Sequence, residues 1–244
     1  MIGISRDGDV VVTMKLQRTE RRNALNTELC VQLREGIEQA VEDDARVVVL
    51  TGEGSAFCAG ADLSGDVYAE GFLDSLTEML TTIEGAPIPV IAAVNGPAIG
   101  AGTQLALASD LRVVAPEARF AVPAARLGIS VDRWTVRRMA TLIGGGAARS
   151  VFLAAESIHP DEALARGLAN RIGDLGAAQA WAQEIATLAP LSLRAMKLFL
   201  NDDHTRDEPS PEQMSALADA WLSEDAQEAR AARAEKRDPV FRGK

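Results

Sequence analysis

The stretch from residue 90 to residue 108 constrains the fold more than any other part of the sequence. The apolar run VIAAV at residues 90–94 predicts a short buried strand, because it is partly β-branched and ends at the turn dipeptide Asn95-Gly96. The step Gly100-Ala101-Gly102 follows, and residues 103–108 have helical composition without a breaker. A strand that leads through a glycine-rich turn into a helix directs unsatisfied backbone N–H groups toward one point. Such a point suits an anionic group.

A second turn of this kind lies upstream, in the segment AFCAGAD at residues 56–62, after a predicted strand at residues 46–51. Neither turn carries a phosphate motif, since both G-x-G-x-x-G and Gly-Lys-Ser/Thr are missing. Two turns on neighbouring strands can direct two backbone N–H groups at one carbonyl oxygen, which is the geometry of an oxyanion hole. The alternative is that the glycines only permit tight turns and close helix–strand packing.

Composition narrows the classes of function. The net charge of -10 and the pI near 4.8 argue against nucleic-acid binding, which normally needs a basic face. Cys30 and Cys58 are too few for a disulfide framework, and neither a signal peptide nor a long apolar span is recognisable, so we expect the reducing cytoplasm and no membrane span. The two histidines form no cluster with cysteine, so we expect no metal.

Strand and helix patterns alternate through the first half of the chain. Residues 2–5 and 10–16 predict a hairpin that turns at Asp7-Gly8. A helix from the N-cap Asn26 to about Val41 then precedes an apolar strand at 46–50, and this order implies a right-handed parallel crossover. A further helix is expected between residues 65 and 87, behind a polar stretch at 64–66. Another runs from Pro160 to the C′ residue Gly167, and a third carries Trp181, Ile185 and Leu188 on one face and ends at Pro190. The remaining helices are expected at 193–200, 214–222 and 226–236, and extended segments at 111–114, 119–122 and 168–172.

The segments AFCAGAD and NGPAIGAGTQLALASDLRVV together resemble the two signature segments of the crotonase (enoyl-CoA hydratase/isomerase) superfamily. QRTERRNALN is similar to the family's RP-x-x-x-NAL segment, and EKRDPVF is similar to its EKR-x-P-x-F ending. The resemblance covers essentially the whole chain and implies an α/β fold, the ClpP/crotonase-like ββα spiral. It implies a core at residues 1–190 and a C-terminal helical trimerisation region at 191–244 within the same functional unit, assembled as a homotrimer or a hexameric dimer of trimers.

The resemblance also implies a ligand and its contacts. The oxyanion-hole donors would be the backbone N–H groups of Ala61 and Ala101, around the carbonyl of an acyl-CoA thioester. Coenzyme A would enter as part of this ligand, without a separate cofactor. The CoA contacts carried over from the family are Arg21, Arg22, Ala24, Ala59, Ala61, Asp62, Leu63 and Lys236.

Hydratases of this family use two glutamates, and the family pattern places them at Gln104 and Ala124 of this chain. An amide can orient water but has no basic lone pair near neutral pH, and alanine can do neither. A positioned acid or base contributes roughly 100- to 10,000-fold, so hydration without both is very slow. The chain looks similar to mycobacterial superfamily members that lack these glutamates, and we expect a fatty acyl-CoA-binding protein of lipid metabolism without hydratase activity.

Asp132 keeps a second chemistry open. Some superfamily members place a nucleophilic or basic carboxylate at this position, which implies an acyl-CoA isomerase or a related enzyme as the alternative. The structural interpretation is that Asp132 N-caps the helix bearing Trp134, a residue expected either in the acyl pocket or in the core. Arg126 and Arg133 are expected to be solvated or paired surface charges. A third interpretation, a structural or protein-binding relic of the fold, predicts no acyl-CoA binding.

Overall fold

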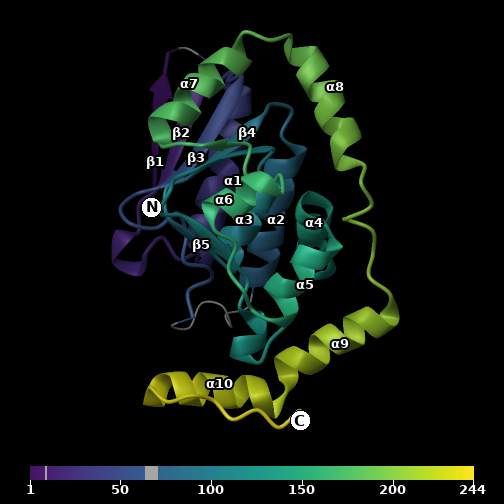
Figure 1. Ribbon diagram of the computed structural model, residues 1–244. Coiled ribbons are helices and arrows are strands. Elements are labelled where there is room, and N and C mark those ends of the chain that lie inside the picture. Colours follow the sequence, from purple (N-terminus) through teal and green to yellow (C-terminus); the bar gives the residue numbers. More distant parts are fainter. Residues whose placement is uncertain (9, 64–70) are drawn as a thin grey trace. The chain divides into compact units, whose positions relative to one another are not determined.

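The computed structural model describes residues 1–8, 10–63 and 71–244, and these form two compact units (Figure 1). The first unit comprises Met1–Phe120 and Ile158–Asp203, and the second comprises Ala121–Ser157 and His204–Lys244. Packing thus divides the chain elsewhere than at residue 190, where the family resemblance places the start of the C-terminal helical region. That functional boundary stays a prediction.

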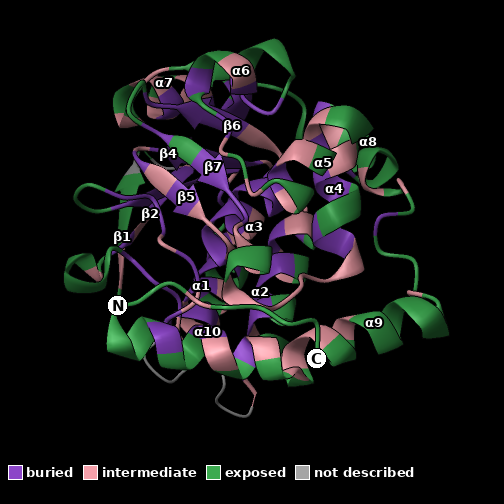
Figure 2. Ribbon diagram, turned by 60° about the horizontal axis from the view of Figure 1, so that its bottom comes forward, coloured by how far each residue is buried: buried purple, intermediate pink, exposed green. Residues whose placement is uncertain are grey.

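A six-stranded sheet forms the centre of the first unit, in the order β1-β2-β3-β4-β6-β8. β1 and β2 form the predicted antiparallel hairpin, with Ile2 opposite Leu16, and the remaining neighbours are parallel. Every residue of β3 and β4 is buried, as expected for parallel strands covered on both faces (Figure 2). The strands are β1 (Ile2–Asp7), β2 (Val11–Leu16), β3 (Val47–Gly52), β4 (Val90–Val94), β6 (Leu111–Val114) and β8 (Arg171–Ile172), and β5 (Pro97–Ile99) pairs separately with β7 (Arg119–Ala121).

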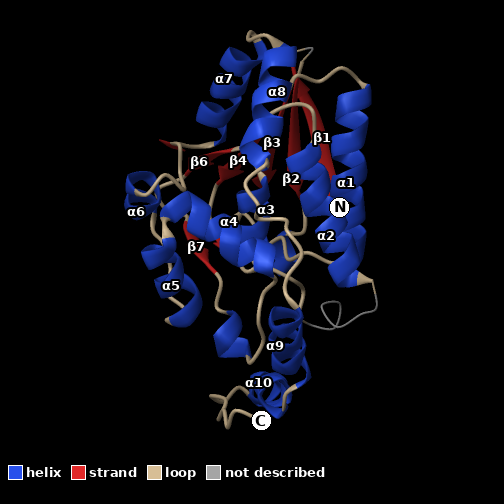
Figure 3. Cartoon of the chain, turned by 90° about the vertical axis from the view of Figure 1, so that its right-hand side faces the viewer, coloured by secondary structure: helices blue, strands red, loops and turns tan. Residues whose placement is uncertain are grey.

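Helices cover both faces of this sheet, and Figure 3 shows its strands between α7 and α1. Ala178 and Ala182 of α7 pack with Val49 and Ile91, and these small side chains let the helix lie close to the strands. Asn26 N-caps α1 as predicted, since its side-chain oxygen accepts the Leu29 N–H at 3.0 Å. The helices of the first unit are η1 (Thr19–Arg21), α1 (Thr27–Glu42), α2 (Phe72–Gly85), α3 (Ala101–Ala108), α6 (Pro160–Ala165), α7 (Leu175–Ala186) and α8 (Pro190–Asn201).

The described part of the second unit is mainly helical. Its α10 is packed against η3, and the two approach so closely that a Cβ on Gly128 would lie 2.6 Å from the Asp225 carbonyl oxygen. Trp221 donates its indole N–H to the Ser130 carbonyl at 3.0 Å, so α9 also holds the segment before α4. The helices are η3 (Ala124–Leu127), α4 (Arg133–Ile143), α5 (Gly145–Leu153), α9 (Pro211–Leu222) and α10 (Glu224–Glu235).

Most of the predicted elements are confirmed, and several details differ. β5 lies in the segment predicted as a turn, and α8 begins at Pro190, three residues before the predicted start. α3 starts at Ala101, two residues before the predicted start, because the glycine-flanked turn feeds directly into the helix. The expected extended piece at 168–172 is a strand only at Arg171–Ile172, and Leu188 lies beyond α7 and is half exposed. The predicted polar stretch at 64–66 lies outside the described residues. Within the described ranges, no helix combines the length and the apolar character needed to cross a membrane.

Candidate functional site

The two glycine-rich turns interlock through their backbones. Cys58 donates its N–H to the Pro97 carbonyl at 3.2 Å, and Ile99 donates to the Cys58 carbonyl at 2.9 Å. This exchange forms a parallel bridge between Cys58 and Ala98. The sequence therefore predicts correctly that the two turns meet.

Glycine is required where the two backbones touch. A Cβ on Gly102 would lie 2.1 Å from the Cys58 carbonyl oxygen, and a Cβ on Gly60 would lie 2.8 Å from the Ile99 carbonyl oxygen. Gly60 also has φ +103°, which few L-residues adopt. The Gly60 position lies beside the amide of Ala101, since the same Cβ would be 3.8 Å from the Ala101 nitrogen. The two glycines thus permit the close approach of one turn to the other.

The backbone N–H groups of Ala61 and Ala101 take no part in the hydrogen bonds that hold the two turns together. Leu25 bonds to both neighbours of Ala61, because its N–H reaches the Gly60 carbonyl at 2.7 Å and its carbonyl accepts the Asp62 N–H at 2.8 Å. Ala101 is the first residue of α3, where a helical N–H has no partner within the helix. Among residues 1–8, 10–63 and 71–244, no backbone hydrogen bond uses the N–H of Ala61 or Ala101. These groups can donate to an oxygen of a ligand.

Two asparagines, the buried Asn23 and the partly buried Asn95, hold the first turn at its base, and the sequence motifs revealed neither role. The Asn23 side chain accepts the Arg18 N–H at 3.0 Å and donates to the carbonyls of Glu53 and Ala56 at 2.9 and 2.8 Å. Asn95 accepts the Gly52 N–H at 3.1 Å and donates to a carbonyl of the same loop. Asn23 is fully buried, and the signal that could have found it is its place in the NAL segment.

The predicted CoA contacts of the first unit lie on two adjoining segments. Ala59 donates its N–H to the Arg22 carbonyl at 3.0 Å, which places the segment around Ala24 beside the first turn. Arg21 and Arg22 are exposed at the end of η1, so their guanidinium groups are accessible. Leu63 is partly buried at the end of the described part of the turn.

The Asp62 side chain has a structural partner. Its carboxylate is buried and forms an ion pair with Arg18 at 2.8 Å, and Arg18 also donates to the Ala24 carbonyl at 2.9 Å. This pair joins the η1 segment to the first turn. The predicted contact between Asp62 and CoA stays a prediction. Arg18 was not predicted, because a pairing across 44 residues leaves no local pattern.

The two positions matched to the hydratase glutamates lie in different units. Gln104 is partly buried in α3, one turn after Ala101, and its N–H donates to the Gly100 carbonyl at 3.0 Å. Ala124 begins η3 in the second unit. Lys236 also belongs to the second unit and is exposed at the C-cap of α10. Neither Gln104 nor Ala124 carries a carboxyl group.

Asp132 N-caps α4, which confirms the structural interpretation. Its carboxylate accepts the Thr135 N–H at 3.3 Å and also the Thr135 hydroxyl. The neighbouring Trp134 is buried, and the Arg206 guanidinium lies 4.2 Å from the centre of its ring. Arg133 is a paired charge: it donates to the carbonyls of residues 204, 205 and 207 and so fixes that loop.

The cysteines offer no ready nucleophile. Burial is the largest cause that raises the pKa of the Cys30 thiol and of the Cys58 thiol, each to about 12. Both groups are therefore protonated near neutral pH, although Cys58 lies within the first turn. Among the described residues, no three His, Cys, Asp or Glu side chains gather as a metal site would require.

The two turns belong to a chain that matches a known protein family over nearly its whole length. Residues 6–244 match the family model described as Enoyl-CoA hydratase/isomerase. The chain belongs to the enoyl-CoA hydratase/isomerase family, the crotonase superfamily. A Mycobacterium leprae protein described as "Probable enoyl-CoA hydratase echA6" is 50% identical over 247 residues, and the alignment covers 100% of both chains. The Mycobacterium tuberculosis (strain CDC 1551) protein of the same description is also 50% identical with full coverage of both.

Solved structures of this family share the fold. The carnitinyl-CoA hydratase from Mycobacterium avium has a TM-score of 0.87, with 31% identity over 100% of this chain and 98% of that one. The enoyl-CoA hydratase/isomerase from Pseudoalteromonas atlantica T6c has a TM-score of 0.86 and 29% identity, with 99% of each chain covered. The crotonase fold predicted from the two signature segments is thereby confirmed.

Proposed function

We propose that this member of the enoyl-CoA hydratase/isomerase family binds a fatty acyl-CoA thioester. The thioester carbonyl accepts hydrogen bonds from the N–H groups of Ala61 and Ala101. The observation that carries the proposal is the backbone interlock at Gly60 and Gly102, which brings together two turns whose amides have no backbone acceptor among the described residues. The α3 dipole adds a partial positive charge at the same amide of Ala101.

Hydration is not part of the proposed function. Relatives 50% identical are described as probable enoyl-CoA hydratases, and the proposal differs from that description on chemical grounds. Water must lose a proton as it adds to an enoyl thioester, and the α-carbon must gain one. Gln104 and Ala124, at the positions matched to the family's glutamates, supply neither an acid nor a base near neutral pH. Binding without rapid turnover follows.

Coenzyme A would lie along the η1 segment and the first turn. Arg21 and Arg22 provide exposed cations for its phosphates on a chain whose net charge is -10. Ala24, Ala59 and Leu63 provide small or apolar surface for the nucleotide. By the family resemblance, Lys236 would provide a cation to the nucleotide bound by a neighbouring subunit. No cofactor besides the CoA of the ligand is proposed.

Self-association is part of the proposal. Most residues of α8 are exposed (Figure 2). Several of its exposed side chains are large and apolar, a pattern that marks interaction surfaces. Burial of such a surface in a closed ring would stabilise a homotrimer or a dimer of trimers. Light scattering behind size exclusion measures the mass and would contradict this point if only monomers elute. The exposed side chains on α8 are Leu191, Met196, Leu198, Phe199 and Leu200.

The binding test is a calorimetric titration with palmitoyl-CoA, with free CoA and palmitate as separate titrants. Palmitoyl-CoA is expected to bind most tightly, because only it offers the nucleotide, the thioester and the chain together. If no thioester binds, the proposal is overturned, and the interpretation as a structural or protein-binding relic of the fold is favoured. Asp132→Ala separates the remaining alternative: acyl-CoA binding survives this change under our proposal, whereas an isomerase that uses Asp132 would lose its activity.

A further inference from the structure

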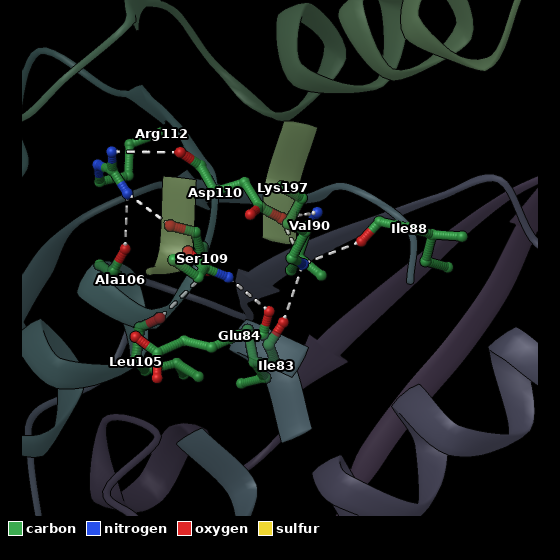
Figure 4. Close-up of polar contacts among 11 residues, drawn as sticks. Ile83, Glu84, Ile88, Val90, Leu105, Ala106, Ser109, Asp110, Arg112 and Lys197 are labelled. Atoms are coloured by element: carbon green, nitrogen blue, oxygen red, sulfur yellow. Dashed lines mark hydrogen bonds and ion pairs between the residues drawn. The ribbon is translucent and has the colours of Figure 1, made fainter. Parts of the chain in front are cut away.

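The C-terminal end of α3 is held by a buried guanidinium group. Arg112 lies on β6 and is 2% exposed. Its Nη1 donates to the Ala106 carbonyl at 3.1 Å and to the Ser109 carbonyl at 2.7 Å (Figure 4). Carbonyls at the end of a helix have no partner within the helix, and a cation at this end also complements the helix dipole. Arg112 therefore stabilises the last turn of α3.

The rest of Arg112 is attached to the sheet. Its backbone N–H donates to the Asn170 side chain at 2.8 Å, its carbonyl accepts the Asn170 N–H at 2.9 Å, and its Nε donates to the Leu168 carbonyl. β6 lies between β4 and β8, so the position of Arg112 is fixed by neighbouring strands. The end of α3 is thus tied to the sheet by one side chain.

A buried ion pair extends this network to α8. The Lys197 ammonium of α8 is 7% exposed and lies 2.7 Å from the Asp110 carboxylate. It also donates to the carbonyls of Ile83 and Ile88, each at 3.1 Å. Asp110 accepts the Val90 N–H at 2.7 Å, so it joins α8 to the start of β4 (Figure 4). All three N–H donors of the ammonium have partners.

The opposite end of α3 carries the proposed oxyanion donor. α3 has eight residues, about 12 Å of helix, and so behaves as a short rigid rod. Thr103 donates its hydroxyl to the Ala98 carbonyl at 2.7 Å, and this is the side-chain hydrogen bond described at the N-terminal end of α3. A shift of the C-terminal end would therefore displace the Ala101 amide. Oxyanion stabilisation requires a donor about 2.7–3.1 Å from the oxygen, so a small displacement weakens it.

We propose that Arg112, supported by the Asp110–Lys197 ion pair, is a positioning residue for the Ala101 amide. This inference rests on the proposed function, since it assumes that the amide polarises a thioester carbonyl. It adds that α8, on the outside of the first unit, is connected to that amide through side chains. The residues that hold α3 are distinct from those that touch the ligand.

The test uses a push–pull thioester, 4-(dimethylamino)cinnamoyl-CoA, whose absorption moves to longer wavelength when its carbonyl accepts stronger hydrogen bonds. Wild-type protein is expected to shift the band of the bound probe. Arg112→Lys keeps the charge but cannot reach the same carbonyls with a fork of donors, so most of the shift is lost. Lys197→Met is expected to lose a smaller part. Affinity for free CoA stays within about twofold in both variants, since its contacts are elsewhere.

Asn201→Ala is the matched control. Asn201 also attaches α8, through a hydrogen bond from its side chain to the Glu84 carbonyl at 2.9 Å, but it does not contact Asp110. The control is expected to keep the full band shift. An unchanged shift in both Arg112→Lys and Lys197→Met, or an equal loss in Asn201→Ala, would overturn the positioning role.

Hydrogen exchange of the ligand-free protein tests the structural part of the inference, that Arg112 holds α3, separately from the proposed function. Amides at residues 104–108 are expected to exchange at least about tenfold faster in Arg112→Lys than in wild type, while β3 amides stay unchanged. If the wild type does not bind or shift the probe, the proposed function is wrong, and the exchange rates still report on α3. If Arg112→Lys does not fold, the same exchange and band-shift measurements on Lys197→Met test the inference. Unchanged exchange in α3 would overturn the inference.

Discussion

The turn pair of the first unit and the segment 124–135 of the second unit differ in the groups that each offers to a ligand. Backbone groups build the turn pair, through Cys58, Ile99 and the two glycines, and the donors it offers are main-chain amides. The segment 124–135 would have to act through side chains, yet Ala124 has no polar group and Asp132 is bonded to Thr135. A ligand site built from backbone groups does not depend on acidic or basic side chains, and this is the basis on which we propose binding without turnover.

The largest effect is expected from Gly102→Val, which tests whether the turn pair depends on backbone contact. The new side chain would meet the Cys58 carbonyl, since even a Cβ would lie 2.1 Å from it. We expect a loss of about 3 kcal/mol or more in the free energy of unfolding, together with loss of acyl-CoA binding. Denaturant titration and calorimetry measure the two.

Gly146→Ala is the control for that change. A Cβ at Gly146 meets no heavy atom within 4 Å, and the position lies in α5. Alanine favours a helix by about 0.5–1 kcal/mol over glycine, so this variant should be slightly stabilised. A stable Gly102→Val protein with normal binding would contradict the backbone-built turn pair.

Lys197→Met tests how much a buried side-chain ion pair, between Lys197 and Asp110, stabilises the first unit. Burial raises the pKa of the Asp110 carboxyl, and Lys197 is the strongest influence that lowers it. Loss of the ammonium leaves a buried carboxylate unpaired and raises that pKa further, at a cost of about 3 kcal/mol in the free energy of unfolding at pH 7. A raised carboxyl pKa means that folding favours the protonated form, so stability is lost as the pH rises through that pKa.

The loss in Lys197→Met should therefore be smaller at pH 5 than at pH 7, as measured by urea titration at both values. Lys197→Met combined with Asp110→Asn is the control, because it removes the titrating group and keeps an acceptor for the Val90 N–H. An equal loss at both pH values in the single variant would show that Asp110 does not carry the cost.

Carboxylates introduced at residues 104 and 124 test whether missing acid–base side chains are what prevents hydration. Gln104→Glu with Ala124→Glu should raise the hydration rate of crotonyl-CoA by at least about 100-fold over the parent, because each positioned acid or base contributes at least that much. The loss of enoyl-thioester absorbance follows the reaction. Gln104→Glu with Ala125→Glu places the second carboxylate on the exposed neighbour and should gain much less. No gain in the first double variant would contradict the assignment of both positions.

The smallest effect is expected from Asp132→Ala. The change removes an N-cap and should lower the free energy of unfolding by about 1 kcal/mol. Affinity for palmitoyl-CoA should stay within about twofold. Asp132→Asn, which retains the cap, should restore the stability. A large loss of a measurable turnover in both variants would instead favour the enzyme that uses Asp132.

Local patterns predicted the elements well, because caps, periodic apolar residues and glycine-rich turns act over a few residues. Asn26, the β4 run and the two turns are examples. Buried polar partnerships could not be predicted in this way. Lys197 and Asp110 are 87 residues apart, and Arg133 is 71, 72 and 74 residues from the three carbonyls that it binds. Such pairs are specified by the tertiary fold, and spacing along the chain does not reveal them.

The most direct test of the central claim is a calorimetric titration of the wild-type protein with crotonyl-CoA and palmitoyl-CoA while the enoyl-thioester absorbance of the crotonyl sample is followed. Our account predicts that palmitoyl-CoA binds tightly and that the crotonyl absorbance does not fall. A rapid fall would mean that a group other than Gln104 and Ala124 supplies the proton chemistry, and the claim of binding without hydration would be contradicted.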